Sequence, residues 1–67
     1  MNAATLPAAG LTIAGLETAY DSLAEAIDRA GADKATLFLV KLALLNANAL
    51  ADAERFREHI EAALRDL

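Results

Sequence analysis

Apolar residues recur along the first part of the chain with the spacing of a helix that packs along one seam. Successive members lie three or four residues apart, and they are Ile13, Leu16, Tyr20, Leu23, Ile27 and Ala30. Thr12 precedes the seam as a helix N-cap does, and Gly31 follows it where a C-terminal cap favours glycine. The pattern predicts a helix over residues 13–30.

A second segment, residues 34–50, is apolar in nearly every direction. On a wheel of about 100° per residue, Lys34, Lys41 and Asn48 share one narrow edge. The other directions carry large apolar side chains, namely Leu37, Phe38, Leu39, Val40, Leu42, Leu44, Leu45 and Leu50. With Asp33 as its expected N-cap, this segment predicts a central helix that must be buried on most sides.

A third helix is predicted over residues 53–66, with Asp52 as its N-cap. Its apolar face consists of Phe56, Ile60, Ala63, Leu64 and Leu67. Glu61 and Arg65 have the i, i+4 spacing of a helical ion pair. Because residues 50–52 are too few for a flexible loop, the second and third helices are expected to meet at a tight corner.

These elements predict an all-α, three-helix domain over residues 12–67, preceded by a loose N-terminal arm over residues 1–11 that contains the one proline. The two flanking helices offer one apolar stripe each, which covers half to two thirds of the central helix. The remaining apolar surface is expected to form an interface. Its predicted members are Leu37, Phe38, Val40, Leu42, Leu44, Leu45 and Asn46. A twofold homodimer with the central helix packed against its copy is the simplest closure, and a larger oligomer or a different partner chain is the competing one.

Composition strengthens the expectation of association. The chain has 67 residues, of which 57% are apolar, but 18 of these are alanines with little side chain to bury. Ordering so short a chain costs on the order of 100 kcal/mol in conformational entropy. Since there is no cysteine, disulfides cannot contribute. Close helix packing and association with another chain remain as sources of stability.

The formal net charge of −4 argues against binding the phosphate backbone of nucleic acids or an anionic membrane surface. The apolar stretch from Ala35 to Ala51 is interrupted by Lys41, Asn46 and Asn48, so it predicts no membrane span. Residues 1–10 lack the basic start of a signal peptide. The expected location is the cytosol of a bacterium.

Few residues offer chemistry. His59, the single histidine, has no glutamate three residues before it, so the di-iron motif of helical bundles fails, and we expect a helix-surface histidine. An acidic stripe on the first helix consists of Glu17, Asp21, Glu25 and Asp28. It is interpreted as a solvated face, with a cation site or contact with Lys34 and Lys41 of a neighbouring helix as alternatives. Asn46 is expected to set the register of an oligomer, or else to line a ligand pocket.

The segments LETAYDSLAEAID, LFLVKLALLNANAL and DAERFREHIEAAL resemble a family of very short proteobacterial proteins known as a domain of unknown function. The likeness covers residues 11–67 and rests on the Leu/Ala patterning, the Tyr after Glu-Thr-Ala and the Leu-Ala-Asp corner. Asn46 and Asn48 depart from the apolar stretch of that pattern. The resemblance implies a compact helical domain and supplies neither an activity nor catalytic residues.

Three functions are compatible with these features. The first is a non-enzymatic helical homo-oligomer that acts as an accessory or interaction protein, with no cofactor. The second is a small subunit or docking partner of a larger enzyme, reached through the central helix. The third is a ligand or metal sensor that uses a cavity of the dimer. We expect no enzymatic activity, because the chain offers no nucleophile, base and orienting group at recognisable spacing.

Overall fold

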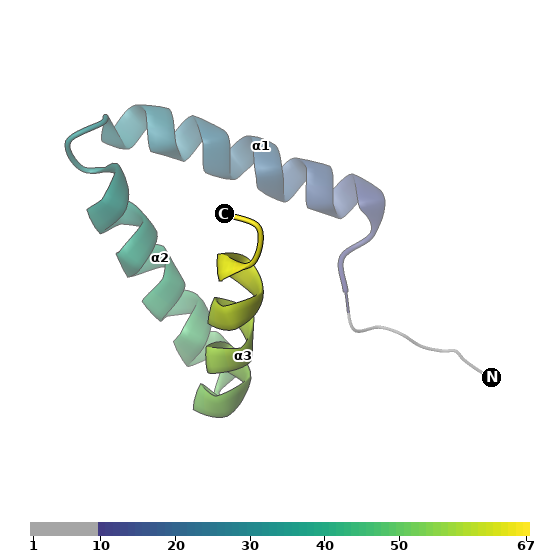
Figure 1. Ribbon diagram of the computed structural model, residues 1–67. Helices are drawn as coiled ribbons and strands as arrows, with labels where there is room; N and C mark the ends of the chain where they lie inside the picture. Colours follow the sequence, from purple (N-terminus) through teal and green to yellow (C-terminus); the bar gives the residue numbers. More distant parts are fainter. Residues whose placement is uncertain (1–9) are drawn as a thin grey trace. The chain divides into compact units, whose positions relative to one another are not determined.

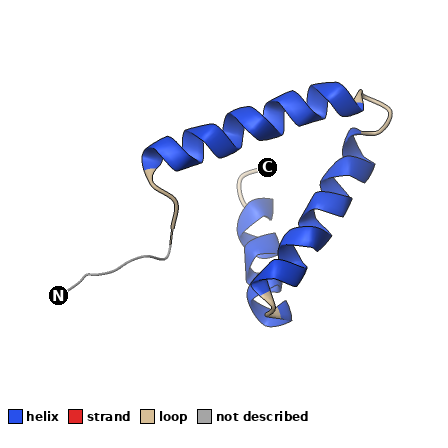
Figure 2. Cartoon of the chain, turned by 180° about the vertical axis from the view of Figure 1, so that it is seen from behind, coloured by secondary structure: helices blue, strands red, loops and turns tan. Residues whose placement is uncertain are grey.

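The computed structural model describes residues 10–67, in which three helices follow one another along the chain (Figure 1). They are α1 (Ile13–Ala30), α2 (Ala35–Leu50) and α3 (Ala53–Leu64). The rest of the described chain is loop and turn (Figure 2). The all-α, three-helix prediction is confirmed. Of the predicted N-terminal arm, Gly10 and Leu11 lie outside any helix, and residues 1–9 lie outside the described part. The chain divides between Asp33 and Lys34 into two units.

The first unit contains α1, whose two ends are capped as the sequence predicts. The Thr12 hydroxyl Oγ1 accepts a hydrogen bond from the Gly15 backbone N–H at 2.9 Å. At the other end, Gly31 adopts a positive φ of 84° and its N–H donates to the Ile27 carbonyl at 3.1 Å. Both contacts satisfy backbone groups that a helix end leaves without intrahelical partners. They explain why α1 begins and ends at the predicted residues.

The second unit begins at Lys34, and α2 starts one residue later than predicted. The prediction that Asp33 caps this helix was wrong, because Lys34 occupies the N-cap position and no side chain accepts there. Asp33 lies in the preceding turn, one residue too early. The Phe38 N–H donates to the Lys34 carbonyl at 2.9 Å, which closes the first helical turn. The start of α2 is therefore determined by the turn and not by a capping side chain.

The link between α2 and α3 is the tight corner that its length predicts. Ala51 adopts the left-handed conformation at φ 61° and ψ 30°, and its N–H donates to the Ala47 carbonyl at 3.0 Å. Asp52 then returns to an extended conformation, and its Oδ1 accepts from the Arg55 N–H at 3.0 Å. The chain reverses direction at this corner (Figure 1). The predicted Asp52 cap is confirmed.

The third helix is two residues shorter than predicted, since Arg65 is extended and Asp66 has a positive φ of 60°. The proposed Glu61–Arg65 pair was wrong for this reason, because the i, i+4 spacing has no meaning beyond the last helical turn. The Arg57 guanidinium instead pairs with the Glu54 carboxylate at 3.2 Å. Both partners are exposed, so the pair contributes a few tenths of a kcal/mol.

Contact between α2 and α3 organises the second unit. On α2 the half-buried residues Ala43, Ala47 and Leu50 share one side of the helix, and on α3 Phe56 is half-buried. The two alanines allow another helix to approach closely. Even so, none of the hydrophobic side chains of residues 10–67 is fully buried. The apolar surface of α2 is therefore larger than the surface that α3 covers.

Candidate functional site

The candidate site is the surface of α2, which carries all seven predicted interface residues. Leu37, Val40, Leu44 and Leu45 are exposed by 58%, 49%, 61% and 68%. Asn46 is exposed as well, while Phe38 and Leu42 are half-buried. A large exposed apolar patch is a common feature of surfaces that bind another molecule. Whether these residues form an interface stays a prediction.

The seven residues lie on two different sides of the helix. At about 100° per residue, Leu37, Val40 and Leu44 fall within roughly 60° of one another, and we call them the leucine face. The second group lies on the other side of the lysines, and it consists of Phe38, Leu42, Leu45 and Asn46. The sequence interpretation treated α2 as apolar in every direction except the edge of Lys34, Lys41 and Asn48, and did not distinguish the two groups. The three- and four-residue steps between Leu37, Val40 and Leu44 were the signal that could have found this division.

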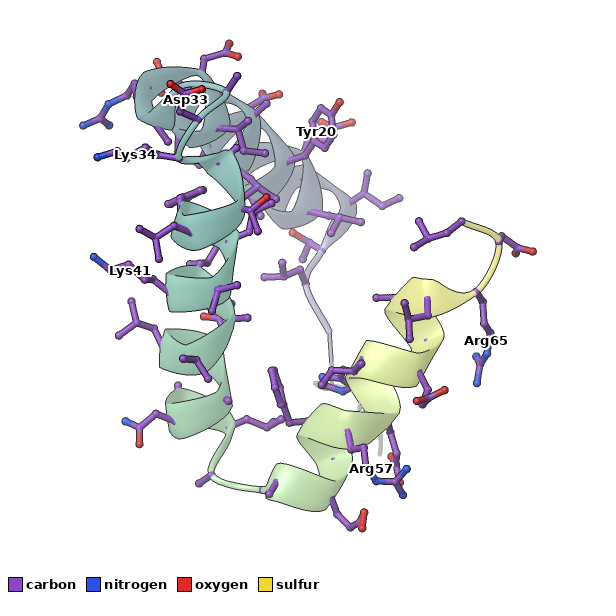
Figure 3. The ribbon with its side chains drawn as sticks, turned by 60° about the vertical axis from the view of Figure 1, so that its left-hand side comes forward. Tyr20, Asp33, Lys34, Lys41, Arg57 and Arg65 are labelled. Atoms are coloured by element: carbon purple, nitrogen blue, oxygen red, sulfur yellow. The ribbon has the colours of Figure 1, made fainter. Side chains whose placement is uncertain are left out.

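The two apolar groups are separated by Lys34 and Lys41, which we call the lysine edge. Figure 3 shows both side chains projecting in the same direction at the N-terminal half of α2. They are seven residues apart, which is about two helical turns. Lys34 is the N-cap residue and Lys41 lies within the helix, and both are exposed. No acidic residue occurs anywhere in α2. The leucine face is therefore bordered by positive charge on one side.

The leucine face has a polar border on one side and a border of small residues on the other. Thr36 and Ala47 continue the helix surface beyond Val40. Small side chains at such a border allow a second helix to lie close to α2. An exposed apolar strip between a charged edge and a small-residue edge has the form of a helix-packing surface.

The remaining predicted chemistry is spread over exposed helix surface. His59 and all four members of the acidic stripe are exposed. Within residues 10–67 no three His, Cys, Asp or Glu side chains come together as a metal site would require. A shallow hollow on α1 is lined by Leu16, Glu17, Tyr20 and Asp21. Its lining comes from neighbouring turns of a single helix, so it is open helix surface and not an enclosed binding cavity.

No helix of the described residues is both long enough and apolar enough to cross a bilayer. Comparison of the chain with protein-family models, with curated proteins and with solved structures finds no match. The resemblance to a domain of unknown function therefore stays an expectation from the sequence. The exposed apolar surface of α2 is the structural feature that bears most directly on function.

Proposed function

We propose that the protein is a non-enzymatic accessory or interaction protein that works as a helical homo-oligomer, with a twofold dimer as its basic form. The observation that carries the proposal is the exposure of Leu37, Val40, Leu44 and Leu45 on one helix. Burying a side chain of this size stabilises an assembly by about 1.5–3 kcal/mol. Four such side chains in each of two copies supply a substantial driving force for association.

A second copy is the partner that this surface suits best. In a twofold dimer, a patch on one copy packs against the same patch, or against a different patch, of the second copy. The apolar surfaces of both copies are then covered together. The net charge of −4 disfavours nucleic acid and anionic membranes as alternative partners. We accordingly propose a protein partner and a cytosolic site of action.

Size exclusion with light scattering tests the proposal. The expected mass is near twice the 7.0 kDa of one chain. Leu44→Asp is expected to give monomer or unfolded chain, because an unpaired charge placed in an apolar interface costs several kcal/mol. Ala53→Asp adds the same charge at an exposed first-turn position of α3, where a carboxylate is favourable, so it should leave the mass unchanged.

Two results would contradict the proposal. One is a stable wild-type monomer down to micromolar concentration. The other is a Leu44→Asp variant that keeps both the dimer mass and the melting temperature of the wild type. Recovery of the chain from its native host in a complex with a larger enzyme, and without any homo-oligomer, would favour the docking-partner function instead.

A further inference from the structure

The helices on either side of residues 31–34 carry opposite charge. The helix α1 contains four acidic residues and one basic residue, Arg29. The helix α2, together with its N-cap residue, contains Lys34 and Lys41 and no acidic residue. Each helix also has an exposed apolar face: Leu16 and Tyr20 of α1 are exposed by 60% and 71%. Each chain therefore offers two uncovered apolar faces, one beside negative charge and one beside positive charge.

The charges repeat with the same period on both helices. Asp21 and Asp28 are seven residues apart, and so are Lys34 and Lys41. Seven residues are about two helical turns, so each pair lies along one line of its helix, roughly 10.5 Å apart along the axis. Two lines of opposite charge with equal spacing can pair at both positions at once.

The handedness of the helix decides which relative direction allows this pairing. Viewed from its N-terminus, a right-handed helix advances clockwise by about 100° per residue. Asp21 and Asp28 lie clockwise of the α1 seam, and the lysine edge lies clockwise of the leucine face. Two helices in face-to-face contact bring their clockwise edges together when they run antiparallel, and separate them when they run parallel. Only the antiparallel arrangement combines apolar contact with charge pairing.

We propose that the leucine face of α2 is covered by α1 of a second copy, packed antiparallel, with Asp28 beside Lys34 and Asp21 beside Lys41. This inference rests on the proposed homo-oligomer and names its interface. In a twofold dimer the contact occurs twice, since each copy gives its α1 to the other. The contact covers the leucine face of each chain and the apolar face of each α1, and Leu45, on the other side of the lysine edge, is not part of it.

Direct packing of α2 on its own copy is less favourable. Antiparallel contact through the leucine face would place the lysine edges of the two copies on the same side, with no acid on α2 to compensate them. Like charges at short distance oppose association. It would also leave Leu16 and Tyr20 of α1 uncovered. The charge pattern therefore favours α1 of the partner as the occupant.

Charge reversal with mixing tests the proposal. One variant carries Asp21→Lys and Asp28→Lys, and the other carries Lys34→Glu and Lys41→Glu. Each alone is expected to dimerise at least tenfold more weakly than the wild type, since all the pairs become repulsive. An equimolar mixture is expected to regain the dimer, because each α1 then meets an α2 of opposite charge. Native mass spectrometry measures the heterodimer directly, and this readout stays informative even where one variant unfolds alone.

Matched controls separate this effect from net charge. Arg57→Glu on α3 with Arg65→Glu just after it changes the net charge as much as the two lysine reversals do. Glu58→Lys with Glu61→Lys on α3 changes it as much as the two aspartate reversals. Both controls should keep the wild-type dimer. Rescue within a single chain carrying all four reversals, but not on mixing, would overturn the proposal, since α1 would then meet α2 of its own chain.

The failures of the two proposals can be told apart. A wild-type chain that is monomeric removes the homo-oligomer and with it this interface. A wild-type dimer that all the reversed variants retain leaves the homo-oligomer standing and shows that another surface covers the leucine face.

Discussion

At the scale of single residues, the helix ends are where local chemistry determined the structure. Thr12 and Asp52 each accept a backbone N–H three residues on, and Gly31 takes the positive φ that glycine tolerates. These contacts span at most four residues, which is why the sequence predicts them. Asp33 fails as a cap for a different reason: the turn extends over residues 32–34, so the helix starts one residue later than predicted.

Ala51 is an alanine in a left-handed conformation, at φ 61°. A Cβ in this region costs roughly 1–2 kcal/mol, which glycine avoids. We expect Ala51→Gly to raise the free energy of unfolding by up to about 1 kcal/mol, because part of this gain is lost to the greater freedom of glycine in the unfolded chain. Urea unfolding followed by circular dichroism measures the change.

The control is Ala49→Gly, the same substitution inside the exposed last turns of α2. It should lower the free energy of unfolding by about 1 kcal/mol. Equal destabilisation by both substitutions would mean that the corner is not left-handed at Ala51.

Asp52 supplies the N-cap of α3 through its Oδ1. Asp52→Ala removes the acceptor and is expected to lower the free energy of unfolding by about 1 kcal/mol. Asp52→Asn keeps an oxygen at the same position and should lose much less. If thermal unfolding finds the two variants equally destabilised, the hydrogen bond to Arg55 is not the source of the stability.

At the scale of elements, α2 differs from its two neighbours in where its apolar residues lie. The helices α1 and α3 each have one apolar face, and their polar sides are easily recognised in sequence. In α2 the apolar residues surround the helix except at the lysine edge. Periodicity alone therefore predicts that the helix is buried but not which of its sides contacts a given neighbour. In the structure Ala43, Ala47 and Leu50 on one side of α2 are half-buried, whereas the leucine face stays exposed.

Glu25 lies on the acidic stripe of α1 but on the side away from the apolar seam, about 160° from its centre on the wheel. Because its carboxylate is exposed, Glu25→Ala should change the free energy of unfolding by less than about 0.5 kcal/mol and leave the dimer mass unchanged. Asp28→Ala, closer to the seam, should weaken the dimer. An analytical ultracentrifugation series on both variants would reveal a structural role of Glu25 if its dimer also weakened.

At the scale of the whole molecule, the described chain leaves much of its apolar surface in contact with solvent. No hydrophobic side chain of residues 10–67 is fully buried, and large apolar residues on all three helices are exposed. A chain of this length has little stability in reserve. In the proposed homo-oligomer, association removes part of these surfaces from water.

If folding and association are coupled, the melting temperature depends on protein concentration. A tenfold increase should raise it by about 5 °C, since the dimer gains about 1.4 kcal/mol per decade of concentration. Thermal unfolding at several concentrations between about 1 and 100 μM, a range of about two decades, checks this expectation. A melting temperature that does not vary with concentration would indicate a monomer that is stable without a partner.

The sequence by itself determined the three helices, three of their caps, the corner after Leu50 and the excess of apolar surface on the middle segment. All of these follow from interactions within four residues or from the helical period, so no distant contact is needed to predict them. The tertiary structure decided the left-handed turn at Ala51, the early end of α3 and which apolar side chains of α2 are half-buried. These features depend on how the chain reverses and on which helix faces can approach one another. Alanine fits many environments, so its position in the sequence predicts neither.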